Sequence, residues 1–245
     1  MRPNPCAKAA AALAALALGA FAPTVLPPAA AAEQTAAATT TITVLGITDL
    51  DGRIERTADP ATGAVTGPGA VTLACEVARA RESSPDALLV SSGDNVGGST
   101  ASPAPLEDRL ALGVLNAMGV DASALGGHEL GRGMDDLTSR ILPATAFPYL
   151  AANLADPALD AEGNGGALIR DVGGVKVGLI GVATDESPSP VAPAAEAANA
   201  RAAELKRTGA ADVVVVLAHA DAAELAARLT GSVDVVLGGR SHATR

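Results

Sequence analysis

Short apolar runs followed by polar, glycine-containing clusters recur along this chain of 245 residues. The run from Ala87 to Val90 is typical of a strand buried on both faces, and it ends in Ser91-Ser-Gly-Asp-Asn followed by Gly97-Gly98. Four more apolar runs, at residues 42–47, 122–125, 213–217 and 233–237, are also followed by polar clusters. Because open α/β sheets bind ligands at the carboxyl ends of their strands, the pattern predicts one site built from five strand ends.

Helical patterns lie between the apolar runs. Residues 71–81 and 196–208 are predicted to be helical, the second closed by Gly209. A short helix is predicted from Met134 to Leu142, stopped by Pro143. A further helix is predicted to begin at Pro105, with its buried stripe formed by Leu106, Leu110, Val114 and Met118.

Two other segments complete the expected fold. Residues 168–172 and 175–183 flank Gly173-Gly174 and are predicted to form a hairpin, whereas residues 59–69 are predicted to be a surface loop. Strands and helices alternate around this hairpin. The sequence therefore predicts an α/β fold with mixed sheets and helices on the outer faces, in one domain from residue 41 to 245.

The first 32 residues have the features of a secretory signal peptide. Arg2 and Lys8 give the chain a basic start, and an apolar stretch follows from Ala9 to Phe21. Small residues up to Ala32 would allow cleavage there. The stretch is too short for a membrane span. We therefore expect a secreted, extracellular protein in which residues 33–40 form a flexible tail.

The composition restricts the partners of the processed protein. The formal charge of −10 would become −12 after loss of Arg2 and Lys8, which argues against nucleic acid and anionic membranes as partners. Only Phe147 and Tyr149 would remain as aromatic residues, so the chain has little with which to stack a nucleobase. Cys75 would be the single thiol, and we expect it to be buried and unpaired. We expect a monomer.

Acids and histidines are concentrated in the polar clusters that follow the five apolar runs. They are Asp49, Asp51, Asp94, His128, His219 and His242, with Asn95 and Glu129 beside them. A single histidine at a strand end is more often structural than a ligand. Here all three histidines of the chain follow an apolar strand, which favours a shared metal site with Asp94 at its centre.

The order of these clusters resembles the metallophosphoesterases of the 5′-nucleotidase type, within the calcineurin-like phosphoesterase superfamily. The resemblance rests on Asp49-Leu-Asp, Gly93-Asp-Asn, Gly126-Gly-His-Glu, His219 and Gly238-Gly-Arg-Ser-His, and on the segments Leu115–Ser123 and Phe147–Asn153. It implies a metallophosphatase-like four-layer sandwich of mixed β-sheets flanked by helices. It also implies hydrolysis of phosphate monoesters, with nucleotides as substrates. Family members continue with further strands and a base-binding domain, so we expect a C-terminally truncated version.

The resemblance also assigns roles to individual residues. In the family two metal ions share one aspartate and activate a water for attack on phosphorus, while a histidine that binds no metal stabilises the leaving group. The shared aspartate would be Asp94 and the catalytic histidine His128. Asp49, Asp51 and His242 would bind the first metal, and His219 would bind the second. Asn95 would bind phosphate.

Four positions depart from the family pattern. Asp51 and Arg240 stand where the family has histidines, Gly127 where it has asparagine, and Gly131 where an aspartate orients the catalytic histidine. Three carboxylates and one imidazole at the first site favour Mn, Mg or Ca over Zn. The second site keeps only two ligands, because glycine offers no donor and a guanidinium has no lone pair. We therefore expect one bound ion rather than two.

Three alternatives stay open. Arg240 either binds phosphate bidentately in place of the second ion, with a catalytic role, or neutralises surplus acids in a site that has lost its chemistry. Asp49-Leu-Asp-Gly also resembles the first motif of haloacid dehalogenase-type phosphatases, with Asp49 as nucleophile, although Arg53 replaces the expected threonine. The last alternative is a catalytically inactive metallophosphatase-fold protein that binds at most one metal or phosphate ion.

Overall fold

The computed structural model describes residues 39–97, 104–160, 163–183 and 192–240, and from Thr40 onward these residues belong to one compact unit. The predicted signal peptide, most of the predicted tail and the predicted ligand His242 lie outside the described residues. Within the unit, two four-stranded sheets carry the fold.

The first sheet is parallel throughout. Its order is β1 (Val44–Ile47), β4 (Leu88–Ser91), β5 (Ala122–Ala124) and β6 (Tyr149–Leu150). The second sheet has the order β10 (Val235–Gly238), β9 (Val213–Ala218), β8 (Val175–Val182) and β7 (Ala167–Val172). Only β7 and β8 are antiparallel, as the predicted hairpin, so the second sheet is mixed.

Alternating side chains of each strand fill two different layers of the core. Leu88 and Val90 of β4 belong to the cluster between the sheets, with Leu179 and Leu217 of the second sheet. Leu89 points the other way and packs among helical residues such as Leu112. A strand buried on both faces reads as a continuous apolar run, which is why the sequence pattern located these strands.

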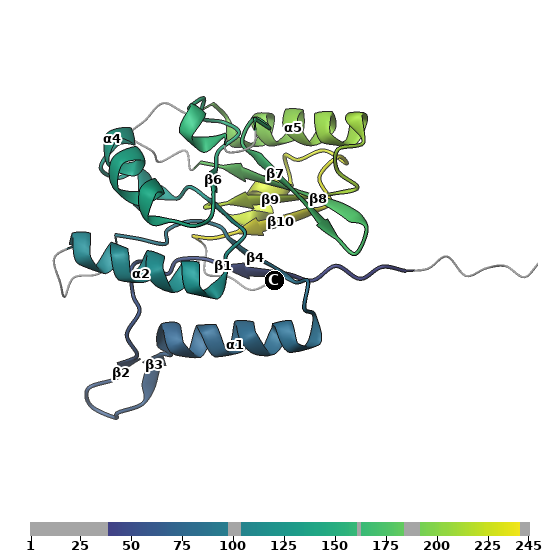
Figure 1. The fold of residues 1–245 in the computed structure, drawn as a ribbon. Coiled ribbons are helices and arrows are strands. Elements are labelled where there is room, and N and C mark those ends of the chain that lie inside the picture. Colours follow the sequence, from purple (N-terminus) through teal and green to yellow (C-terminus); the bar gives the residue numbers. More distant parts are fainter. Residues whose placement is uncertain (1–38, 98–103, 161–162, 184–191, 241–245) are drawn as a thin grey trace, which may run out of the picture. The chain divides into compact units, whose positions relative to one another are not determined.

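Helices cover the outer face of each sheet. α1 (Gly69–Ser83) and α2 (Ala104–Met118) lie on the side of the first sheet, and α5 (Ala194–Thr208) lies on the side of the second (Figure 1). Gly209 ends α5 in the left-handed conformation with φ of 67°. The result is the four-layer sandwich that the sequence predicted.

The remaining elements are short. They are β2 (Thr57–Ala58), β3 (Val65–Gly67), α3 (Gly127–Leu130), α4 (Met134–Asp136), a π-helical turn (Leu137–Ile141), 3₁₀ turns (Leu142–Ala144 and Pro157–Leu159) and α6 (Ala222–Ala226). None of the helices in the described ranges combines the length and apolar character that crossing a membrane requires.

Two predicted segments differ in the structure. The expected loop at 59–69 contains β3, which pairs with β2, because the Asp59 carboxylate accepts hydrogen bonds from the backbone N–H groups of Ala61 and Thr62 and tightens the turn. The expected helix from Met134 to Leu142 widens into a π turn. Pro143 does not stop it but lies at the start of the following 3₁₀ turn, where a missing N–H costs nothing.

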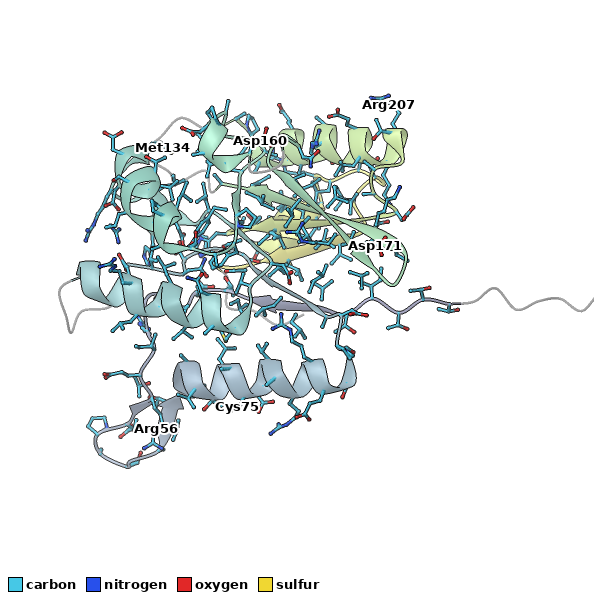
Figure 2. All side chains as sticks on the ribbon, viewed as in Figure 1. Arg56, Cys75, Met134, Asp160, Asp171 and Arg207 are labelled. Atoms are coloured by element: carbon cyan, nitrogen blue, oxygen red, sulfur yellow. The ribbon has the colours of Figure 1, made fainter. Side chains whose placement is uncertain are left out.

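Two predicted burials were also wrong. Leu110 is 49% exposed, because residues at four-residue spacing drift around a helix of 3.6 residues per turn, and Leu112 and Leu115 fill the core instead. Cys75 is exposed, since α1 turns Val77 toward the core and Cys75 to the outer side (Figure 2).

Candidate metal centre

The loops that follow β1 and β4 are joined by backbone hydrogen bonds. The N–H groups of Asp49, Asp51 and Gly52 donate to the carbonyl oxygens of Gly93, Asp94 and Asn95, at 3.2, 2.9 and 2.9 Å. Parallel strands bring their carboxyl ends to one edge, and these bonds continue the register of β1 and β4 beyond the sheet. The predicted site residues Asp49, Asp51, Asp94 and Asn95 are thereby fixed side by side.

The backbone at the predicted site is strained. Asp49, Asp51, Asp94 and Arg240 have φ values of 52°, 54°, 53° and 62°, and they are all the non-glycine residues with positive φ in the described ranges. Aspartate tolerates this region better than arginine does. Residues held in sparsely populated conformations cost about 1–3 kcal/mol each and concentrate at functional sites. All four are among the residues that the sequence predicts for the site.

Asp49, Asp94 and His219 form one group of potential metal ligands. The Nε2 atom of His219 lies 3.0 Å from Asp49 Oδ1 and 3.3 Å from Asp94 Oδ2. The hydroxyl of Thr48 donates to Asp49 Oδ2 at 2.6 Å, which fixes the other carboxylate oxygen. Two carboxylates and an imidazole nitrogen, all within 4.8 Å of one another, are a suitable donor set for a divalent cation.

Asp51, Asp94 and His128 form a second group. The Nδ1 atom of His128 lies 3.1 Å from Asp51 Oδ1 and 3.6 Å from Asp94 Oδ2. Burial raises the pKa of Asp51, and the nearby charges of His128 and Arg53 oppose this shift. The Nδ1 atom is also 3.0 Å from the carbonyl oxygen of Val96, which can only accept a hydrogen bond. Nδ1 is therefore better suited to carry a proton than to bind a metal.

The two groups share Asp94 but divide the other residues differently from the sequence prediction. That prediction assigns Asp49 and Asp51 to one metal and His219 to another. Among the described residues, Asp49 is grouped with His219, and Asp51 with His128.

Glu129 organises the centre, a role that the sequence analysis did not assign to it. The side chain is fully buried, and its two carboxylate oxygens accept hydrogen bonds from the backbone N–H groups of Asp94, Asn95 and Gly126 at 3.0, 2.7 and 2.9 Å. The hydroxyl of Tyr149 donates to it at 3.3 Å. Burial raises the pKa of Glu129, against the effect of the N–H donors. A glutamate three residues after Gly126 at a helix start was the available signal.

Asn95 does not face the site. Its amide oxygen accepts from the Ser91 hydroxyl at 2.7 Å, and its amide nitrogen donates to the Ser123 and Tyr149 hydroxyls at 2.9 and 3.1 Å. The residue is fully buried. These contacts use the side chain within the protein interior, so the phosphate contact predicted for Asn95 is replaced by a structural role.

Two glycines allow the loops to approach one another. A Cβ atom at Gly126 would lie 2.0 Å from Asp94 Oδ1, and one at Gly239 would lie 2.2 Å from the Thr48 hydroxyl and 2.8 Å from His219 Cδ2. Any side chain at either position would displace a residue of the centre.

The departures from the family pattern lie around the same centre. A Cβ atom at Gly127 would meet no heavy atom within 4 Å, so the position is open. The backbone N–H of Arg240 donates to Asp49 Oδ2 at 3.4 Å, and the residue lines a groove of about 450 Å³ together with Asp221, Glu224 and Arg228. Gly131 ends α3 and carries no carboxylate toward His128.

Comparison with known proteins agrees with this geometry. The chain is 30% identical to the 5′-nucleotidase of Bos taurus over an alignment 256 residues long, which covers 98% of this chain and 42% of that protein. It superimposes on the 5′-nucleotidase precursor from Thermus thermophilus with a TM-score of 0.66 and 26% identity, covering 82% of this chain and 42% of that one. The chain is a member of the 5′-nucleotidase-type metallophosphoesterases.

This 5′-nucleotidase homologue spans less than half the length of these relatives. It is also 30% identical over 234 residues to the cell wall protein Lmo0130 of Listeria monocytogenes, covering 80% of this chain and 30% of that protein. No family model matches the chain. The predicted family and fold class are confirmed.

Proposed function

We propose that this 5′-nucleotidase homologue is a secreted, metal-dependent phosphoesterase that hydrolyses phosphate monoesters with one bound cation. The observation that carries the proposal is the position of Asp94, which is shared by two acid–histidine groups at the ends of parallel strands. A carboxylate in this position can help to hold a cation next to a histidine that donates a proton.

The first group would hold the cation. Asp49, Asp94 and His219 supply two carboxylate oxygens and one imidazole nitrogen, with Thr48 and Glu129 fixing the carboxylate-bearing loops. Oxygen-rich sets favour Mn or Mg, and Ca remains compatible with them. When bound, such a cation supplies Lewis-acid stabilisation of the phosphoryl oxygens and lowers the pKa of water.

The second cation position would be impaired. Gly127 supplies no donor atom, and the Arg240 guanidinium has no lone pair. Both residues lie beside the centre, and Arg240 is bonded to it through its backbone N–H. A positive arginine here offers charge for a phosphate oxygen rather than a ligand for a metal, which supports one ion per chain.

His128 would act without binding metal. Its Nδ1 atom is engaged by the Val96 carbonyl, and 43% of its side chain is exposed, so the ring can exchange a proton with a bound ester. Protonation of the leaving oxygen by a positioned histidine is typical of such chemistry.

The substrate would be bound through its phosphate rather than through a base. Nucleotides enter the proposal because the names of the relatives specify 5′-nucleotidases. Phe147 and Tyr149 are both buried, with their rings 5.6 Å apart in the core, so neither can stack on a nucleobase. We therefore expect similar activity on AMP and on a simple aryl phosphate.

The test is metal analysis of the purified protein beside a Mn-supplemented assay on p-nitrophenyl phosphate and AMP. One ion per chain with turnover that is lost in Asp94→Asn supports the proposal. The matched control is Asp86→Asn, an exposed aspartate in the turn before β4. Absence of metal and turnover would instead support the inactive fold, and a phosphorylated Asp49 would support the haloacid dehalogenase-type reaction.

Secretion rests on a separate observation. The basic and apolar N-terminal residues up to Ala32 have the pattern of a leader, and one relative is named a cell wall protein. N-terminal sequencing of protein recovered from culture medium should begin near residue 33. Recovery only from the cytoplasm, with Met1 present, would contradict this part of the proposal.

A further inference from the structure

His128 is held from two sides by the chain segment that follows Asp94. Its backbone N–H donates to Asp94 Oδ1 at 3.0 Å, and its Nδ1 atom lies 3.0 Å from the carbonyl oxygen of Val96. The ring packs directly on Gly97, where a Cβ atom would lie 3.1 Å from His128 Cβ. The orientation of the ring therefore depends on where residues 96 and 97 are held.

A buried ion pair holds that segment in place. The backbone N–H of Gly97 donates to Asp108 Oδ1 at 3.0 Å, and Asp108, which is 2% exposed, comes from α2. The second oxygen of Asp108 accepts from Arg140 at 2.5 Å. Arg140 lies in the π turn and is itself fixed by two hydrogen bonds to Asp136. Asp108 thus links residues 96 and 97 both to α2, on which it lies, and to the π turn that carries Arg140.

We propose that Asp108 and Arg140 are positioning residues that fix the Val96 carbonyl as the acceptor of the His128 Nδ1 proton. This inference rests on the proposed function. It assigns to the Val96 carbonyl, with Asp51 Oδ1 at 3.1 Å from the same Nδ1 atom, the orienting task that an aspartate performs in the family pattern and that Gly131 cannot perform here.

The consequence is a defined tautomer. A carbonyl oxygen only accepts, so the proton of neutral His128 is fixed on Nδ1 and the lone pair on Nε2. In the protonated ring, Nε2–H can be donated. As a water oxygen adds to phosphorus and releases its proton to solvent, the bond from phosphorus to the ester oxygen breaks; its electron pair stays on the ester oxygen, which takes the Nε2 proton. Nε2 forms no hydrogen bond within the described part of the chain that would compete with this transfer.

The tautomer can be read without turnover, by ¹⁵N NMR of the histidine side chains in protein free of added metal. The chain has three histidines, so the His128 signals are identified by their loss in His128→Gln. We expect the Nδ1–H tautomer in the wild type. A wild type with the Nε2–H tautomer would overturn the inference even if the enzyme is active, and the expected tautomer would support it even if no activity is found.

Two variants then test the positioning residues. In Asp108→Asn the neutral amide weakens the bond to Gly97 and the attraction to Arg140, so we expect mixed tautomers and a fall in kcat of roughly 10–100-fold with little change in KM. Asp135→Asn is the matched control, since Asp135 is exposed and one residue from Asp136. If Asp108→Asn is poorly folded, Arg140→Gln leaves the Gly97 bond in place and should give a smaller shift in the same direction.

A rescue experiment separates positioning from general stability. Gly131→Asp should restore the Nδ1–H tautomer in the Asp108→Asn background, because a Cβ atom there would lie 3.3 Å from the Gly127 carbonyl oxygen and needs only a small adjustment. A merely structural loss would not respond to the aspartate that the family pattern has at this position. Unchanged tautomer and kcat in both Asp108→Asn and Arg140→Gln would refute the proposal.

Discussion

Replacement of Glu129 by glutamine would test how the centre is held together. The carboxylate accepts four hydrogen bonds, two on each oxygen, from the N–H groups of Asp94, Asn95 and Gly126 and the hydroxyl of Tyr149. Glutamine has the same shape but only one acceptor oxygen. In one orientation its NH₂ group would leave the N–H groups of Asp94 and Gly126 unsatisfied, and in the other that of Asn95, in a fully buried place.

The magnitude follows from these contacts. Each unsatisfied buried donor costs about 1–3 kcal/mol. Removing a buried charge returns part of this cost, because burial disfavours the ionised carboxyl and raises the pKa of Glu129. We expect a net loss of about 2–4 kcal/mol, a large share of the typical 5–15 kcal/mol of a folded domain. Loosening of the Asp94 backbone should also weaken metal binding.

The assay is urea unfolding followed by circular dichroism, at pH 7, with Glu76→Gln as the matched control. Glu76 is exposed and pairs with Arg79 at 3.0 Å on α1, so its loss should cost a few tenths of a kcal/mol at most. A protonated Glu129 would resemble glutamine in shape and charge. Stability of Glu129→Gln equal to that of the control would therefore show that Glu129 is neutral, and the account of an ionised acceptor would fail.

Three further changes have defined outcomes. Gly126→Ala should cost roughly 1–3 kcal/mol in thermal unfolding and abolish metal binding, because its Cβ atom would overlap the shared aspartate, whereas Gly231→Ala meets nothing within 4 Å and should be neutral. The hydrogen bond from Arg140 lowers the pKa of Asp136. The stability that this carboxylate contributes is therefore present above pH 3.8 and is lost as the pH falls through the lowered pKa. In acid unfolding, Asp136→Asn should remove this stability, which is worth under about 1 kcal/mol. Gly127→Asn combined with Arg240→His should raise the metal content from one to two ions per chain, measured by elemental analysis, and an unchanged content would show that donor loss is not the limiting defect.

The strands and the position of the centre could be predicted because both depend on local pattern. Continuous apolar runs locate strands that are buried on both faces, and parallel pairing then brings residues such as Asp49, Asp94 and His219 to one edge whatever the loops do. The hairpin and the end of α5 at Gly209 followed from turn chemistry. No long-range contact had to be known for any of these.

The errors concern residues whose role is decided by distant partners. Asn95 stands on a glycine-rich loop and looks functional, but Ser123 and Tyr149 draw it into the interior. Glu129 accepts hydrogen bonds from the N–H groups of Asp94 and Asn95, about 35 positions earlier in the chain, and no spacing rule predicts such contacts. The exposure of Leu110 was missed for a simpler reason, because a four-residue spacing does not follow a straight stripe along a helix.

On the proposed function, the backbone around the second cation position remains suitable although two of its donors are missing. Arg240 retains a positive φ of 62°, which costs arginine more than it costs aspartate or glycine, and its N–H still reaches Asp49. Gly239 remains too crowded for any side chain, and Gly127 leaves open space where an amide would fit. A loop that had simply drifted would relax to negative φ. Under the proposed one-ion function, what the second cation position lacks is two donor side chains rather than a suitable backbone, and for this reason restoring those two side chains is the decisive substitution.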